Sequence, residues 1–215
     1  MPSQSPADQS LETLQDIKRM MERSSRFISL SGLSGVSAGL CALVGAYIAR
    51  GWIISYGNNT RTESFPAEAR DIFVWQIVLL GLGVLLAALV SSLWFTWRKA
   101  RKGRLPFWDH ASKKLAINMA IPLAAGGLFV LGLLAHSGWE YVAPSCLVFY
   151  GLALVNASKY TLTDIRYLGL MEIALGCINM YYPHFGLYFW AIGFGVLHII
   201  YGLIMWWKYE RGGER

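Results

Sequence analysis

Two ionisable side chains, Glu172 and His198, lie in the middle of apolar runs near the end of the chain. A glutamate and a histidine that meet away from water titrate as a coupled pair, and histidine exchanges protons near neutral pH. The two runs extend over 165–182 and 185–207 and are separated by a short turn at Pro183. Because about 20 apolar residues suffice to cross a bilayer, both runs are predicted to be membrane-spanning helices.

The two side chains are expected to lie at similar depth. With a rise of about 1.5 Å per residue, Glu172 lies about 10 Å from the start of its helix and His198 about 13 Å from the end of its own. Antiparallel helices joined by a short turn bring these positions side by side. Small or polar residues share each helical face: Gly169, Gly176 and Asn179 with Glu172, and Gly195, Tyr201 and Gly202 with His198. The two faces are therefore predicted to contact each other.

Other predicted helices carry polar side chains at comparable depth. The candidates for a shared site are Glu172, His198, Asn179, Tyr201, Ser34, Ser37, Asn118 and Asn156. One interpretation is structural, with a hydrogen-bonded Glu–His pair that sets the register of two helices. The other is functional, with a cytoplasm-facing pocket or half-channel that holds a proton, a metal ion or a small ligand.

The motifs of common enzymes and metal sites are absent from the sequence. It has no HExxH and no GxSxG motif, and its 4 histidines form no run. The cysteines Cys41, Cys146 and Cys177 lie in apolar segments without CxxC spacing, so neither a disulfide framework nor a thiolate metal site is expected. We therefore expect a non-enzymatic protein without a metal or cofactor.

Composition and segment length indicate a membrane protein. The 215 residues are 55% hydrophobic and 15% charged, whereas soluble domains have about 25% charged residues. Six apolar segments are long enough, or nearly so, to cross a bilayer: 27–49, 72–97, 115–135, 139–157, 165–182 and 185–207. The sequence predicts an all-α, polytopic membrane helix bundle of six transmembrane helices in three hairpins, with one transmembrane domain over 27–207 and a tail over 208–215.

The distribution of basic residues predicts the orientation of this bundle. Sixteen of the 19 lysines and arginines lie in the N-terminal region, in 98–114, in 158–166 and in the C-terminal tail, and three lie in 50–71. The positive-inside rule places both termini in the cytoplasm and 50–71 outside, with a turn at the Asn-Asn-Thr run 58–60. Basic residues at the ends of spans fit contacts with anionic lipid better than binding of nucleic acid.

The N-terminal 26 residues lack an apolar run. Leucine, isoleucine and methionine recur at helical spacing over 10–26, which predicts an amphipathic helix before the first span. One interpretation is a helix that lies on the membrane surface. The other is a docking helix for a second copy of the chain or for a cytoplasmic protein partner.

The last hairpin carries a glycine pattern that resembles a known family. Its segments G-x-x-x-I-x-L-G and G-F-G-x-x-x-x-x-Y-G-L, on either side of Pro183, are similar to the short repeats of the bacterial HdeD-like, acid-stress-associated membrane proteins. The triplet Tyr-Gly-Leu also recurs, at 150–152 and 201–203. The whole chain, with ETLQDIKRMMERSSRFISLSGLSG near its start, resembles an uncharacterised bacterial family of six-helix integral membrane proteins.

These resemblances imply a multi-pass protein of the bacterial inner membrane with a role in stress. The leading prediction is a non-enzymatic, stress-associated or sensory protein with a cytoplasm-facing polar pocket. The alternative is a small oligomeric transporter or channel for protons or a small solute. Transport predicts flux in reconstituted vesicles, whereas sensing predicts a cytoplasmic binding partner without flux.

Overall fold

The computed structural model describes residues 31–62, 67–103 and 108–211, and every regular element in these ranges is helical. The predicted amphipathic helix over 10–26 lies outside the described residues. The first long helices are α2 (Gly32–Thr62), α3 (Ala67–Lys102), α4 (His110–Ala135), α5 (Val142–Ala157) and α6 (Asp164–Tyr181). Short 3₁₀ turns, η1 (Trp139–Tyr141) and η2 (Ser158–Tyr160), come directly before and after α5.

The last membrane-length segment is not one uniform helix. After the turn η3 (Pro183–Phe185) it consists of α7 (Gly186–Trp190), a π-helical segment η4 (Ala191–Leu197) and α8 (His198–Tyr209). A π-helical turn is wider than an α-helical turn, and such turns are frequent at functional sites. His198 is the first residue after this widened part.

Five segments of the described residues are long and apolar enough to cross a membrane: Gly32–Gly57, Arg70–Lys102, His110–Ala135, Trp139–Tyr160 and Pro183–Tyr209. α6 has 18 residues but includes Asp164, Arg166 and Glu172, so its composition is less apolar. Large apolar side chains are exposed along the helices, among them Leu79, Leu86 and Val90 of α3, whereas Glu172 and Asn179 are buried. A polar interior inside an apolar exterior is the arrangement of a protein surrounded by lipid.

The prediction of a turn at 58–60 is wrong. α2 continues through these residues to Thr62, and α3 begins at Ala67, so the connection is much shorter than the predicted loop 50–71. The segment from 50 to 62 contains no proline, and continued helical hydrogen bonding satisfies its backbone groups where the chain leaves the apolar span. At the start of α4, by contrast, polar side chains cap the helix: Ser112 N donates to Asp109 Oδ1 (2.7 Å) and Asp109 N donates to Ser112 Oγ (2.8 Å).

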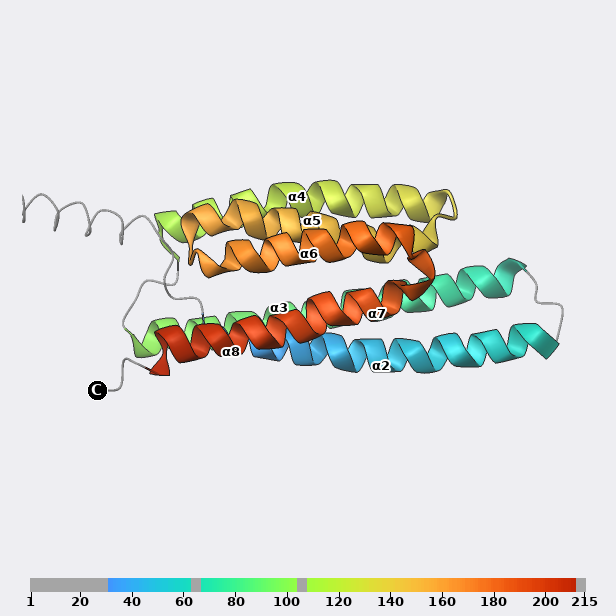
Figure 1. Cartoon of the computed structure of the whole chain (residues 1–215), viewed down its shortest axis with the longest axis horizontal. Coiled ribbons are helices and arrows are strands. Elements are labelled where there is room, and N and C mark those ends of the chain that lie inside the picture. Colours follow the sequence, from blue (N-terminus) through green and yellow to red (C-terminus); the bar gives the residue numbers. More distant parts are fainter. Residues whose placement is uncertain (1–30, 63–66, 104–107, 212–215) are drawn as a thin grey trace, which may run out of the picture.

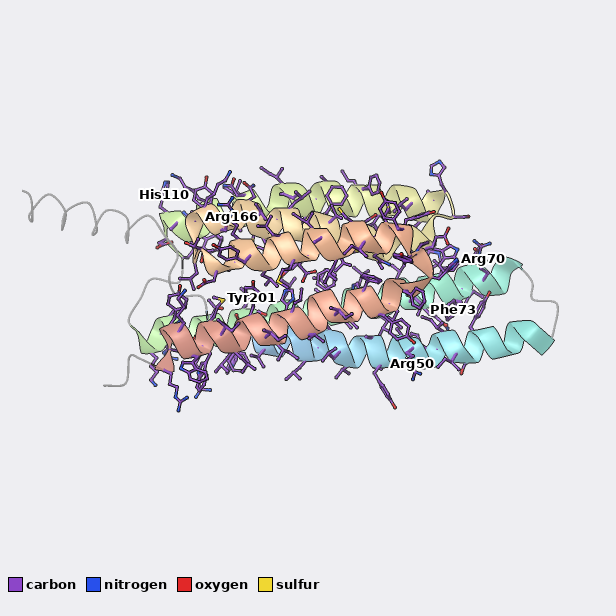
Figure 2. All side chains as sticks on the ribbon, in the orientation of Figure 1. Arg50, Arg70, Phe73, His110, Arg166 and Tyr201 are labelled. Atoms are coloured by element: carbon purple, nitrogen blue, oxygen red, sulfur yellow. The ribbon has the colours of Figure 1, made fainter. Side chains whose placement is uncertain are left out.

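The helices form two groups (Figure 1). The upper group contains α4, α5 and α6, and the lower group contains α2, α3 and the broken helix α7–η4–α8. The last hairpin is therefore divided, because its first helix packs mainly on α5 and its final part, α8, packs mainly on α2. Charged residues lie toward both ends of the bundle, since Figure 2 shows His110 and Arg166 at one end and Arg70 toward the other. We refer to the end with His110 and Arg166 as the basic end.

Glycines explain why the last hairpin is divided. A Cβ on Gly169 of α6 would lie 2.7 Å from the carbonyl oxygen of Gly151 in α5. In the lower group, a Cβ on Gly202 of α8 would lie 2.7 Å from the carbonyl oxygen of Gly32 in α2. Such contacts exist only where a side chain is missing on the approaching face. The predicted contact between the small faces of α6 and α8 therefore does not include their glycines, because Gly169 packs on α5 and Gly202 packs on α2.

Candidate functional site

Glu172 of α6 is enclosed at the junction of the upper and lower groups. Its exposed fraction is 0%, and neither carboxylate oxygen has a hydrogen-bond partner among the described residues. Its Oε1 lies 3.4 Å from Nδ1 of His198, which is itself buried. The predicted proximity of Glu172 and His198 is confirmed, and the two residues belong to opposite groups of helices.

Both ring nitrogens of His198 have a hydrogen-bond partner besides the contact of Nδ1 with Glu172. Nδ1 lies 3.0 Å from the carbonyl oxygen of Gly193, and Nε2 lies 2.9 Å from the hydroxyl oxygen of Tyr150 in α5. A carbonyl oxygen only accepts, so Nδ1 carries the hydrogen that joins it to Gly193. Nε2 then accepts from the Tyr150 hydroxyl when the imidazole is neutral and donates to it when the imidazole is charged. The same geometry therefore accommodates both protonation states of His198.

The backbone of the π-helical segment η4 approaches the carboxylate of Glu172 closely. Gly193 lies inside this segment, and a Cβ there would be 2.5 Å from Glu172 Oε2 and 2.5 Å from Leu147 Cδ2. Any larger residue at this position would displace the carboxylate or the leucine. Phe194 adds an aromatic wall, with its ring centroid 5.1 Å from that of Tyr150 and 6.1 Å from that of His198.

Tyr150 is the residue of this cluster that the sequence did not indicate. It comes from the second hairpin, and only the recurrence of Tyr-Gly-Leu in the sequence distinguished it from other aromatic residues in apolar helices. Its counterpart in that recurrence, Tyr201, was a candidate, but Tyr201 donates its hydroxyl to the sulfur of Met171 at 3.6 Å and makes no contact of this kind with His198. Of the two tyrosines in the repeated triplet, the one that contacts His198 is therefore Tyr150 and not the predicted Tyr201.

The asparagine and serine candidates form separate contacts between neighbouring helices. Asn156 Nδ2 donates to the carbonyl oxygen of Asn118 at 2.8 Å, which joins α5 to α4. Ser37 Oγ donates to the carbonyl oxygen of Ser34 at 2.9 Å within α2, and Ser92 of α3 donates to the same oxygen at 3.1 Å. These four candidates serve helix packing, and the structure does not join them to Glu172 and His198.

Asn179 is the one other candidate on the face of α6 that carries Glu172. It is fully buried, two turns from Glu172 in the direction away from the basic end. Its Nδ2 donates to the carbonyl oxygen of Tyr182 at 2.9 Å, and its Oδ1 has no partner among the described residues. Tyr182 is exposed, so Asn179 is hydrogen-bonded to the backbone of a surface residue.

The opposite side of the site is apolar. A cluster of buried side chains continues from the site toward the basic end: Leu154, Ile165, Leu168, Leu197 and Met205.

An open hollow of about 540 Å³ is lined by Trp52, Gln76, Leu79 and Leu80 of α2 and α3, away from Glu172 and His198. The residues of the predicted cytoplasm-facing pocket are thus dispersed, and Glu172 is closed off in this conformation.

The same two helices, α6 and α8, meet again at the basic end. Lys208 Nζ lies 2.9 Å from Asp164 Oδ2, and the hydroxyl of Tyr209 donates to that oxygen at 2.7 Å. Asp164 is the first residue of α6 and precedes the predicted span. Partial burial raises the pKa of Asp164, but the hydrogen bonds from Lys208 and Tyr209 outweigh it and hold this pKa below its usual value.

The fold and the site define a class: an all-helical protein of the integral membrane type with a buried Glu–His–Tyr cluster between two groups of helices. No family model, curated protein or solved structure matches the chain. The resemblances stated from the sequence therefore stay predictions. In the described part of the chain, no group of three or more histidine, cysteine, aspartate or glutamate residues is placed to hold a metal ion.

Proposed function

We propose that this protein is a non-enzymatic proton sensor of a bacterial inner membrane, with the Glu172–His198–Tyr150 cluster as its sensing group. The observation that carries the proposal is the position of Glu172, fully buried, with its nearest ionisable partner on the other group of helices. A charge in such a place is costly unless a partner compensates it. The number of protons in the cluster therefore influences how the two groups of helices fit together.

The cluster has neutral and charged protonation states. With one proton to share, Glu172 and His198 are either an ion pair or two neutral groups, and the net charge is zero in both cases. Addition of a second proton leaves a positive imidazole, and removal of the last proton leaves a carboxylate alone in low dielectric. Since protonation can shift a conformational equilibrium only if the two conformations bind the proton differently, the junction of the two groups is the element that responds.

The proposed role includes the stress association and the membrane orientation predicted from the sequence. We propose six spans with both termini in the cytoplasm, which places the basic end at the cytoplasmic surface, and a homo-oligomer or a cytoplasmic partner bound through residues 10–26 as the route for the signal. A reporter fused after Arg215 should be active only in the cytoplasm, and a cysteine introduced at Asn58 should be labelled from outside intact cells. Periplasmic activity of the reporter would contradict this orientation.

The experiment that tests the sensing function measures the melting temperature of the protein in lipid vesicles as a function of pH. Wild-type protein should show a pH-dependent change that Glu172→Gln removes. The matched control is Glu140→Gln, the same chemical change in η1 outside the cluster, which should keep the response. A full pH response in Glu172→Gln would contradict the proposal.

The second candidate is a small oligomeric transporter or channel for protons or a small solute. It is supported by the π-helical segment, because many transporters place interrupted helices beside polar groups near the middle of the membrane. Proton flux into vesicles that contain the purified protein, abolished by Glu172→Gln, would favour this candidate. A pH response without flux would favour the sensor.

A further inference from the structure

We infer that the Glu172–His198 site exchanges protons with the end of the bundle opposite the basic end, along the contact between α6 and α7–η4, where Asn179 Oδ1 accepts a hydrogen bond from the water that carries the proton. The inference deepens the proposed function, on which it rests, by naming the side and the route of proton entry. It also departs from the sequence-based prediction of a pocket that opens to the cytoplasm.

The first observation is a row of buried acceptor atoms. Among the described residues, the buried side-chain oxygens and nitrogens without a hydrogen-bond partner are both carboxylate oxygens of Glu172 and the Oδ1 of Asn179. The two residues share one face of α6, seven positions or about 10 Å apart along the helix. Buried acceptors are normally hydrogen-bonded. A row of acceptors without donors suits a small species that donates hydrogen bonds, and water that carries a proton is such a species.

The second observation is that each of these side chains faces a glycine of the partner segment. A Cβ on Gly193 would lie 2.5 Å from Glu172 Oε2, and a Cβ on Gly186 would lie 3.9 Å from Asn179 Oδ1. The glycines are seven residues apart, as are the two polar residues, so the same antiparallel register places both pairs. At both levels the partner segment therefore presents backbone, not a side chain, to the polar group.

The third observation is the third wall of this contact, which α5 provides. Ala143 of α5 lies at the level of Asn179, since its Cβ would be 3.2 Å from a Cβ on Gly186. Leu147 lies one turn further along, at the level of Glu172, and its exposed fraction is 0%. The Leu147 side chain stands between the two levels, since its Cβ would be 3.0 Å from a Cβ on Gly176 and its Cδ2 2.5 Å from a Cβ on Gly193. Val148 lines the same wall, with Cγ2 2.7 Å from a Cβ on Gly176.

The fourth observation is the difference between the two directions from the site. Toward Tyr182, the next polar group on α6 is Asn179, hydrogen-bonded to the carbonyl oxygen of an exposed residue. Toward the basic end, Leu168 on α6 and Leu154 on α5 are buried and apolar, each one turn beyond the site. The polar side chain on this side is Tyr201 of α8, whose hydroxyl donates to the sulfur of Met171 at 3.6 Å and not to the cluster. Protons move along polar groups and water, so the first direction is the favoured one.

No other titratable side chain competes for this role around Glu172. α5 contributes Tyr150 and α8 contributes His198, and the seven residues of η4 include no titratable side chain. Tyr201 of α8 is partly exposed and its hydroxyl donates to Met171, not to the cluster. Tyr188 of α7 is exposed, and the cysteine of α6, Cys177, is also exposed. The remaining cysteine nearby, Cys146 of α5, is partly exposed.

The test follows the protonation of Glu172 in the full-length protein after a pH jump on one side of oriented vesicles. The probe is the infrared band of the Glu172 carboxyl group, identified by its loss in Glu172→Gln. The band should follow the pH on the side of Tyr182. Asn179→Leu should slow the response about tenfold, which corresponds to about 1.4 kcal/mol in the barrier. Asn179→Ser, which keeps a polar group, should remain close to wild type.

A second pair of variants tests the route independently of Asn179. Leu147→Ala should speed the response, because it removes the side chain between the two levels. Leu154→Ala is the matched control, a buried leucine of α5 on the other side of Tyr150, and should leave the rate unchanged. If Asn179→Leu does not fold, an unchanged rate in Leu147→Ala overturns the inference.

The outcomes separate this inference from the proposed function. A band that follows the pH at the basic end overturns the inference and leaves the sensor intact. An Asn179→Leu variant that folds and responds at the wild-type rate has the same consequence. A Glu172 band that does not respond to pH on either side overturns both.

Discussion

α6 and α8 meet through polar side chains at two levels, and the two contacts differ in their access to water. In the centre, Glu172 is 0% exposed and its oxygens lack hydrogen-bond partners among the described residues. At the basic end, Lys208 and Asp164 have side-chain exposed fractions of 54% and 21%, and the carboxylate accepts from two donors. The levels are about 12 Å apart along α6. Similar residue types therefore stand in opposite environments on one pair of helices.

The comparison shows that contact distance alone does not define a functional site. Water stabilises the separated charges at the basic end, so that pair contributes little to stability and is screened by salt. In the centre no water replaces a lost partner, so the same kind of contact couples its proton to the fit between the two groups of helices. The shortest ion pair of α6 and α8 is thus not the one with the greatest expected effect.

The largest effect should come from filling the space beside the central carboxylate. Gly193→Val places side-chain atoms where a Cβ is already 2.5 Å from Glu172 Oε2. Overpacking of this kind should lower the free energy of unfolding by about 1–3 kcal/mol, measured by denaturant titration in detergent micelles. The control is Gly132→Val in α4, where a Cβ would meet nothing within 4 Å. Equal losses in both variants would show that the central level is not tightly packed.

Removal of one partner of the central pair should have the next largest effect. Glu172→Gln and His198→Ala should each lower the free energy of unfolding by about 0.6–1.7 kcal/mol, the range measured for side-chain hydrogen bonds in membranes. The double variant should lose less than the sum of the two, because the partners interact directly. Strictly additive losses in this double-mutant cycle would mean that the two side chains do not interact.

Tyr150→Phe should have a smaller effect. It removes only the hydroxyl that lies 2.9 Å from His198 Nε2, and should lower the free energy of unfolding by about 0.6 kcal/mol. Tyr201→Phe is the matched control, since its hydroxyl contacts the weak acceptor sulfur of Met171 at 3.6 Å. A larger loss of stability from Tyr201→Phe than from Tyr150→Phe would mean that Tyr201, and not Tyr150, belongs to the polar cluster.

The smallest effect belongs to the basic end. Because the pKa of Asp164 is lowered in the folded protein, its contribution is complete above the unfolded value of about 3.9 and is lost as the pH falls through the folded pKa. Wild-type protein should therefore lose more stability in acid than Asp164→Asn does, and high salt should reduce the difference. Melting curves between neutral and acidic pH measure it. A loss that exceeds those of the central variants would reverse the comparison.

The course of the helices was predictable in part. The apolar segments match the long helices because the backbone in an apolar environment must satisfy its hydrogen bonds within the segment. The prediction failed at residues 58–60, where two asparagines suggested a turn but the helix continues to Thr62. A turn preference of this size is weaker than the continuation of helical hydrogen bonds from a long preceding helix.

The sequence by itself determined the membrane class and the proximity of Glu172 and His198, since a short turn between antiparallel spans leaves residues of equal depth side by side. Only the tertiary structure decided which helices meet through their glycine faces, because Gly151 and Gly169, like Gly32 and Gly202, come from different hairpins. That choice places α6 and α8 in different groups of helices, brings Tyr150 to His198, and leaves Asn118, Asn156, Ser34 and Ser37 in other contacts. Packing between distant segments depends on complementary surfaces, and no periodicity within a single segment records which partner will supply them.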